Sequence, residues 1–276
     1  MALIEVLGQP AVALRSPNGA RATVLLHGAH VVSWQPAGLP EQLYLSPQAK
    51  AGPGQAVRGG IPVIFPQFER RGPLPRHGFA RDRAWTLLDQ GGPGQHAQAV
   101  LRLADDAATR SLWPHAFEAE LTVSLTGRTL EMELAVLNTG EQPLTFTTAL
   151  HTYLRCDDVR ECRVSGLLGH AFENSLRGTT HQQEIEPLTL VGEIDRIYWN
   201  VDTPVVLQAL RRRLALTAAG FPDRVIWNPG PDKAATLADL PDADWQHLLC
   251  IEAACIGQPV MLAAGQEWAA RQTLQA

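Results

Sequence analysis

The strongest constraint on the fold is a strict alternation of apolar and polar residues between positions 121 and 136. The apolar members are Leu121, Val123, Leu125, Leu130, Met132, Leu134 and Val136. A period of two is the period of a β-strand, because successive side chains point to opposite faces. Residues 126–128 break the pattern and include a glycine. The segment therefore predicts a β-hairpin with one buried face.

Other segments of similar character indicate that strands dominate the chain. We expect strands at residues 23–26, 31–34, 144–154, 205–210, 213–217, 224–227 and 248–255. Glycine and proline separate them densely, with 23 and 20 copies, as turns between short strands require. Helical patterns are limited to residues 233–240, which follow a proline, and 242–248. The sequence predicts an all-β sandwich or barrel.

The length and composition favour one domain spanning residues 1–276. The chain has 276 residues, of which 45% are hydrophobic and 18% charged, enough to bury a large core. No internal repeat or linker divides it. The net charge is −5, whereas a general nucleic-acid binder needs a basic surface. A general nucleic-acid binder is therefore not expected. We expect a small-molecule partner and a monomer or weak homodimer.

The cysteines and the N-terminus favour a cytoplasmic protein. None of the four cysteines forms a CxxC pair, and residues 1–10 show no basic segment followed by an apolar run. Reduced, buried thiols are therefore the default expectation. No apolar run reaches the length of a membrane span, so no membrane association is expected.

Arginines are concentrated between Arg58 and Arg83. Six of the 21 arginines fall there, among prolines that fix φ and glycines that permit unusual φ, so we expect a stiff, shaped loop. Guanidinium groups on a stiff loop suit a small anion, and phosphate matches them best. Arg58, Arg76 and Arg81 flank the glycines and His77, which makes them the better anion ligands. We expect Arg70, Arg71 and Arg83 to be solvated.

His151 and Glu252 are the candidates for proton transfer. On a strand over residues 144–154, His151 and Tyr153 share the more polar face. His151 is either a hydrogen-bonded structural residue or a proton donor and acceptor near neutral pH. Glu252 is a lone carboxylate in the apolar segment HLLCIEAACIG. It either pairs with a buried cation or amide, or acts as a base whose pKa burial has raised.

Three more features remain open at this point. His77 is either a turn residue or a ligand contact, and Asp195 either caps a turn or accepts sugar hydroxyls. Trp34, Trp199 and Trp227 either pack in the core or stack on a sugar ring. Nine histidines are present, but no HxH or HExxH pattern appears, so we expect neither a metal site nor a cofactor.

Several segments together resemble the hexose-6-phosphate mutarotases, the glucose-6-phosphate 1-epimerase branch of the aldose 1-epimerase family. They are RGGIPVIFP at 58–66, HGFAR at 77–81, ALHTY at 149–153, DRIY at 195–198, VIWNP at 225–229, IE at 251–252 and PVMLAAGQEW at 259–268. The resemblance runs from about residue 20 to the C-terminus. Position 76, often Gln or a small polar residue in relatives, is Arg76 here.

The resemblance implies a galactose-mutarotase-like β-supersandwich and an isomerase that interconverts the α and β anomers of an aldohexose 6-phosphate. It implies His151 and Glu252 as the catalytic pair, and Arg58, Arg81 and Asp195 as substrate ligands; we add Arg76 and His77 as contacts. Alternatives are an aldose 1-epimerase for unphosphorylated sugars and a non-catalytic carbohydrate-binding protein on the same fold. A glycoside hydrolase would need two facing carboxylates, and only Glu252 stands out.

Overall fold

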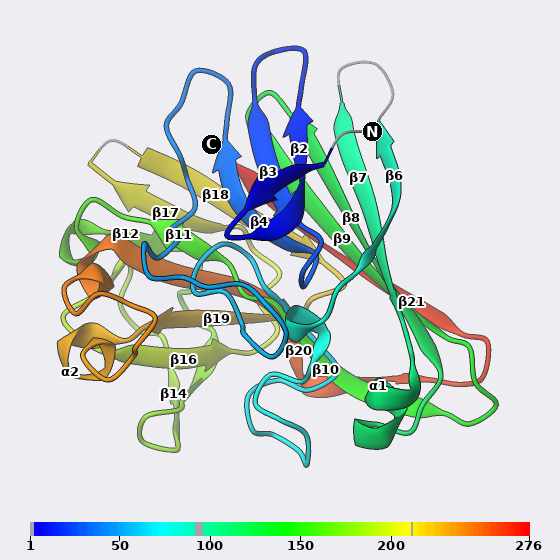
Figure 1. Cartoon of the computed structure of the whole chain (residues 1–276). Coiled ribbons are helices and arrows are strands. Elements are labelled where there is room, and N and C mark those ends of the chain that lie inside the picture. Colours follow the sequence, from blue (N-terminus) through cyan, green and yellow to red (C-terminus); the bar gives the residue numbers. More distant parts are fainter. Residues whose placement is uncertain (1–2, 92–95, 211) are drawn as a thin grey trace.

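The structure, a computed structural model, describes residues 3–91, 96–210 and 212–276. Within these ranges nearly all of the regular secondary structure is β-strand, arranged in three sheets of nine, eight and four strands. The pairs between their strands are antiparallel (Figure 1). The all-β prediction is therefore confirmed.

The nine-stranded sheet contains the hairpin predicted for residues 121–136. Its strands, in spatial order, are β15 (Leu188–Thr189), β12 (Arg163–Ser165), β17 (Val205–Ala209), β18 (Arg212–Ala219), β21 (Glu267–Gln275), β9 (Thr129–Asn138), β8 (Phe117–Thr126), β7 (Ala97–Ala104) and β6 (Thr86–Gly91). Leu121 pairs with Leu134, and Leu125 with Leu130. The apolar positions thus share one face, as their period predicted.

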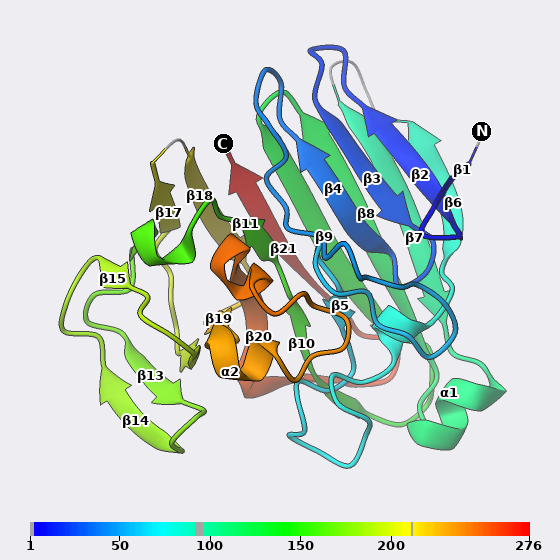
Figure 2. The same ribbon diagram turned by 60° about the vertical axis from the view of Figure 1, so that its left-hand side comes forward.

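The two smaller sheets cover the nine-stranded one. The four-stranded sheet comprises β1 (Ile4–Val6), β2 (Gln9–Arg15), β3 (Arg21–Leu25) and β4 (His30–Gln35). The eight-stranded sheet runs β14 (Thr179–Gln182), β13 (Ala171–Asn174), β16 (Ile194–Tyr198), β19 (Asp223–Asn228), β20 (Leu248–Leu262), β10 (Leu144–Leu150) and β5 (Val63–Ile64), with β11 (Tyr153–Arg155) also paired to β20. Figure 2 shows the four-stranded sheet in front of β7, β8 and β9.

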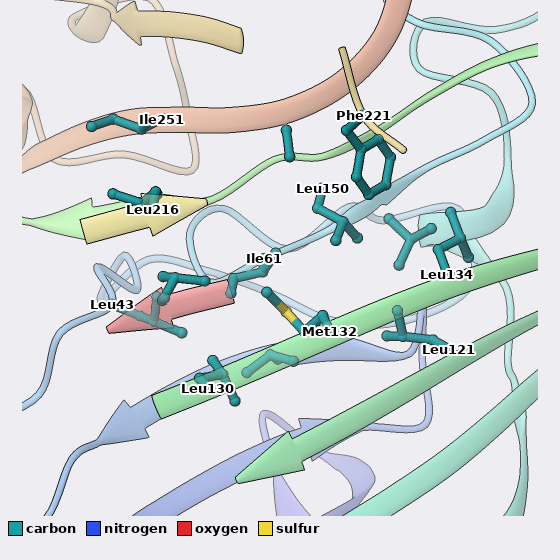
Figure 3. Packing of buried hydrophobic residues seen from close by; sticks show 14 of the residues in the cluster. Leu43, Ile61, Leu121, Leu130, Met132, Leu134, Leu150, Leu216, Phe221 and Ile251 are labelled. Atoms are coloured by element: carbon teal, nitrogen blue, oxygen red, sulfur yellow. The ribbon is translucent and has the colours of Figure 1, made fainter. Parts of the chain in front are cut away.

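One apolar core joins the three sheets. Leu121, Leu134 and Met132 of the nine-stranded sheet belong to the same buried cluster as Ile251 and Leu150 of the eight-stranded sheet (Figure 3). The same cluster includes residues of β2, β3 and β4. Burying a leucine or phenylalanine side chain fully contributes roughly 1.5–3 kcal/mol, so this shared core fixes how the sheets pack.

The eight-stranded sheet has a second, outer face that carries chemistry. Along β20, Leu249, Ile251 and Ala253 enter the shared core, whereas Cys250 and Ala254 belong to a separate buried cluster. Glu252 lies between those two, on the outer side. The alternation in β16 and β19 likewise places Ile197, Val225 and Trp227 outward. This face supports the candidate site.

Some predicted elements differ from those observed. The strand expected over residues 144–154 is two strands, β10 and β11, separated by His151 and Thr152, and both pair with β20 in the same register. The helix expected at 233–240 is α2 (Gly230–Ala234), followed by turns. The one at 242–248 is the 3₁₀ helix η3 (Asp244–His247). The remaining helical segments, which were not predicted, are α1 (Ala107–Leu112), η1 (Ala80–Asp82) and η2 (Val159–Glu161).

No helix in the described ranges is both long and apolar enough to cross a membrane.

Candidate active site

A cavity of about 530 Å³ opens on the outer face of the eight-stranded sheet. Strands β11, β16, β19 and β20 form its floor, and residues from the 56–81 segment and from α2 and the turns after it form its walls. All seven site residues predicted from the sequence line it: Arg58, Arg76, His77, Arg81, His151, Asp195 and Glu252. The fold thus gathers in one place residues that are widely separated along the chain.

His151 and Glu252 face each other inside this cavity. Nε2 of His151 lies 3.3 Å from Oε1 of Glu252. Both residues are buried, and within the described part of the chain His151 Nδ1 and Glu252 Oε2 have no hydrogen-bond partner. The two groups are therefore placed to exchange a proton with each other or with a ligand that binds beside them in the cavity.

Burial shifts the two pKa values in opposite directions. The pKa of Glu252 is raised well above its usual value, mainly by burial and then by the nearby Asp195 carboxylate. The pKa of His151 is lowered well below its usual value, again mainly by burial, followed by the Arg81 and Arg58 cations. Both shifts disfavour charge. The pair therefore tends to hold one proton over a wide range of pH.

Aromatic rings enclose the His151 imidazole. The Tyr153 ring stacks on it, with centroids 4.8 Å apart and planes inclined by 10°. Trp227 and His77 meet it edge-on, at 6.1 and 5.7 Å. The backbone amide of Glu69 donates to Nδ1 of His77, so the proton of neutral His77 resides on Nε2. Burial lowers the His77 pKa strongly, which favours that neutral form.

Arg58 lines the cavity and is held there by two side chains. Its Nε is 3.1 Å from Oδ1 of Asp239, and its Nη1 donates to the Tyr153 hydroxyl at 3.0 Å. The two glycines after it hold this loop against the core. A Cβ at Gly59 would lie 2.4 Å from the Tyr44 carbonyl oxygen, and one at Gly60 2.3 Å from that of Val31. Only glycine permits so close a backbone approach.

Arg81 and Arg76 differ in how closely a carboxylate approaches them. Arg81 is largely buried, and burial lowers its pKa. Its Nη2 donates to the Arg76 carbonyl, but its nearest described carboxylate, Asp82, is 3.9 Å away. Arg76 is paired with Glu69 at 2.6 Å. Among the three arginines expected to bind an anion, Arg81 is thus the one least compensated by a carboxylate.

Arg70 and Arg71 are solvated, as expected, but they lie closer to the site than the sequence indicated. Both are exposed, as predicted, but both also line the rim of the cavity, and Arg71 pairs with Glu173. The 67–75 loop folds back toward the site because Gln67 hydrogen-bonds to Glu69 and Leu74 within it. A count of arginines in the sequence does not reveal this return.

Asp195 lies on the outer face of β16, directly opposite Trp227 of β19. Burial raises its pKa, and the Lys233 ammonium partly offsets that effect. Lys233 also lines the cavity and pairs with Glu193 at 2.9 Å. Among the tryptophans, Trp34 is wholly buried in the core, whereas Trp227 lines the cavity. Trp34 is thus a core residue, whereas stacking of Trp227 on a sugar ring stays a prediction.

Sequence reasoning missed the importance of Tyr153 and Asp239. Tyr153 was placed on the same face as His151 by alternation, which would have been the usable signal. No sequence signal pointed to Asp239, because its role depends on a contact with Arg58, which is far away along the chain. No cluster of three or more His, Cys, Asp or Glu side chains in the described ranges is arranged to hold a metal ion.

Comparison with known proteins identifies the family of the chain. The family model described as "Aldose 1-epimerase" matches residues 10–275. The chain belongs to the aldose 1-epimerase family. A relative from Cenchrus ciliaris, named "Putative glucose-6-phosphate 1-epimerase", is 32% identical over 98% of this chain and 85% of its own length. A relative of the same name from Escherichia coli K12 is 34% identical over 85% of this chain and 79% of its own length.

Solved structures show the same fold. A "putative mutarotase" from Salmonella typhimurium matches with a TM-score of 0.90 and 28% identity, over 99% of this chain and 92% of that one. A galactose mutarotase related enzyme from Lactobacillus acidophilus matches with a TM-score of 0.74 and 17% identity, over 96% and 97% of the two chains. The predicted galactose-mutarotase-like fold and membership of a sugar isomerase family are therefore confirmed.

Proposed function

We propose that this family member interconverts the α and β anomers of an aldohexose 6-phosphate, with glucose 6-phosphate as the substrate. The observation that carries the proposal is one cavity that holds both a facing acid–base pair and a nearly uncompensated, largely buried arginine. His151 and Glu252 form the pair, and Arg81 is the arginine. The printed names of the relatives from Cenchrus ciliaris and Escherichia coli support the phosphorylated substrate.

The proposed reaction needs one proton taken and one proton given. Once the proton of the pair has passed from Glu252 to His151 across their 3.3 Å contact, Glu252 accepts the proton of the O1 hydroxyl, the C1–O5 bond breaks, and His151 gives a proton to O5. The open-chain aldehyde then turns about the C1–C2 bond, and ring closure on the other face reverses both transfers. O1 and O5 are bonded to the same carbon, so two groups held 3.3 Å apart can serve both. Each such transfer typically contributes about 10²–10⁴-fold to the rate.

The remaining residues would hold the substrate in place. Arg58 and Arg81 bind the phosphate, and His77 presents its Nε2 proton to a sugar oxygen near the ring. Asp195 accepts hydroxyl groups, and Arg76 adds a contact at the entrance. Charge-assisted hydrogen bonds from arginine to phosphate are strong and directional. Energy from the remote phosphate would thus be used to orient C1 beside the acid–base pair.

We further propose one domain over residues 1–276, a small-molecule sugar phosphate as the partner, and no requirement for a second copy of the chain. All seven proposed site residues come from a single chain, and one apolar cluster joins the three sheets. The monomer or weak homodimer and the cytoplasmic location expected from the sequence are kept as part of this proposal.

The test is anomer exchange followed by saturation-transfer NMR on glucose 6-phosphate. Wild-type protein is expected to accelerate exchange well above the enzyme-free rate, and far more for glucose 6-phosphate than for glucose. Equal efficiency on the two sugars would instead assign the chain to unphosphorylated aldoses. Binding of the sugar phosphate without any acceleration would identify a carbohydrate-binding protein.

A further inference from the structure

Tyr153 connects the two halves of the site. We infer that Tyr153 is a positioning residue through which an anion bound at Arg58 fixes the catalytic orientation of His151. The inference rests on the proposed function and deepens it. The phosphate of the substrate would then activate the chemistry as well as strengthen binding.

The connection is a continuous chain of contacts. Nη1 of Arg58 donates to the Tyr153 hydroxyl at 3.0 Å, and the Tyr153 ring lies almost parallel to the His151 ring at 4.8 Å. Tyr153 is buried, and Arg58 is its hydrogen-bond partner among the described side chains. A shift of the Arg58 guanidinium therefore moves the tyrosine ring, and the stacked imidazole must follow.

Apart from the stack on Tyr153, the His151 ring has one close polar contact, from Nε2 to Oε1 of Glu252 at 3.3 Å, and that contact lies at the edge of the ring. The His151 backbone is held by the bond from its amide to Pro62, but its Nδ1 has no hydrogen-bond partner within the described residues. Trp227 and His77 touch only its edges. The stack on Tyr153 is thus the contact that sets the plane of the ring. Proton transfer to O5 depends on that plane, because it determines where Nε2 points.

Arg58 is well suited to transmit the presence of an anion. Its guanidinium is planar and rigid, and two of its edges are held by Asp239 and Tyr153. Its Nη2 group has no hydrogen-bond partner among the described residues, and the side chain lines the cavity. A dianion on that open edge would lock the plane of the group. Tyr153 and His151 would be locked with it.

The charges of the arginines also link a bound anion to His151. After burial, the Arg81, Arg58 and Arg76 cations each contribute to lowering the pKa of His151. A dianion bound among these arginines would offset their effect and favour a proton on the imidazole. His151 must hold a proton to give it to O5, so the same event that orients the ring would also help to charge it.

The inference is tested by separating the anion from the sugar. Xylose has the ring of glucose without C6, so it leaves the phosphate region free for inorganic phosphite. Exchange between xylose anomers is measured by saturation-transfer NMR with and without phosphite, and the enzyme-free rate at each phosphite concentration is subtracted. Saturating phosphite is expected to accelerate the enzyme on xylose by at least about tenfold, a fraction of what an oriented general acid contributes.

Two variants locate the link. Tyr153→Phe keeps the ring stacked on His151 and removes only the hydroxyl that Arg58 contacts, so the acceleration at saturating phosphite is expected to fall toward one. Asp239→Asn weakens the hold on Arg58 from the side away from His151. It is expected to require more phosphite for half of the effect and to retain the wild-type acceleration at saturation.

The outcomes are distinguishable. Rapid exchange of glucose 6-phosphate together with no phosphite effect on xylose would overturn the inference and leave the phosphate as a binding group only. A wild-type acceleration that persists in Tyr153→Phe would remove Tyr153 from the link. Failure to exchange glucose 6-phosphate at all would overturn both the proposed function and this inference.

Discussion

Nε2 of His151 and Oε1 of Glu252 lie 3.3 Å apart in the cavity, although they come from segments distant in the sequence. Neither group is held by a bonded partner on its other polar atom within the described chain. A protein that needed these residues only for stability would gain more from hydrogen-bonding or replacing them, because unpartnered buried polar groups are costly. Their arrangement is explained by a ligand that binds in the cavity beside both of them.

Glu252→Gln should separate activity from stability. The amide has the same shape but cannot accept the O1 proton, so kcat on glucose 6-phosphate is expected to fall by about 10²-fold or more. The buried carboxylate carries a desolvation cost that the amide lowers. The thermal midpoint, measured by calorimetry, is therefore expected to stay level or rise. Wild-type activity in this variant would exclude Glu252 as the base.

The pH dependence should show a broad plateau. Activity needs one proton on the His151–Glu252 pair. A raised pKa keeps Glu252 protonated to higher pH than usual, and a lowered pKa keeps His151 neutral to lower pH. The one-proton state thus extends beyond the interval between about 4.3 and 6.5 that ordinary Glu and His would give.

The profile is measured as kcat at saturating glucose 6-phosphate, because the substrate phosphate itself gains a proton near pH 6. The enzyme-free rate at each pH is subtracted. A narrow optimum confined between the ordinary pKa values of Glu and His would contradict the opposite shifts of the pair.

Arg81→Gln should weaken recognition of the phosphate specifically. A hydrogen bond to a charged group contributes about 1.5–3 kcal/mol, which corresponds to a rise in KM for glucose 6-phosphate of roughly 10- to 100-fold. The effect on glucose is expected to be much smaller. Arg71→Gln is the matched control, because Arg71 is exposed and already paired with Glu173. Equal effects of the two changes would argue against a phosphate site at Arg81.

Gly60→Ala should destabilise the protein more than Gly38→Ala. Both glycines have positive φ, 63° and 73°, so both substitutions carry the left-handed backbone cost of about 1–2 kcal/mol. Only at Gly60 would the new Cβ also meet a carbonyl oxygen, at 2.3 Å, whereas nothing lies within 4 Å at Gly38. The difference in unfolding free energy, from urea titration, is expected to be about 1–3 kcal/mol. Equal losses of unfolding free energy in the two variants would mean that the backbone around Gly60 shifts readily to accommodate the methyl group.

The sequence by itself determined the strand content and the face that each strand residue presents. Alternation placed Tyr153 on the same side as His151. The isolation of Glu252 among apolar neighbours marked it as a costly carboxylate with a function to explain. These inferences succeeded because side-chain direction in a strand has a period of two and depends only on the local chain.

Tertiary structure alone decided which of these residues meet. Val225 lies opposite Glu252, and Trp227 opposite both Asp195 and Cys250, because of strand registers set by pairing over long distances. The pairing of Arg58 with Asp239 and that of Arg71 with Glu173 likewise follow from contacts between remote segments. Strand order and register depend on burying the shared core of all three sheets, which no local pattern encodes.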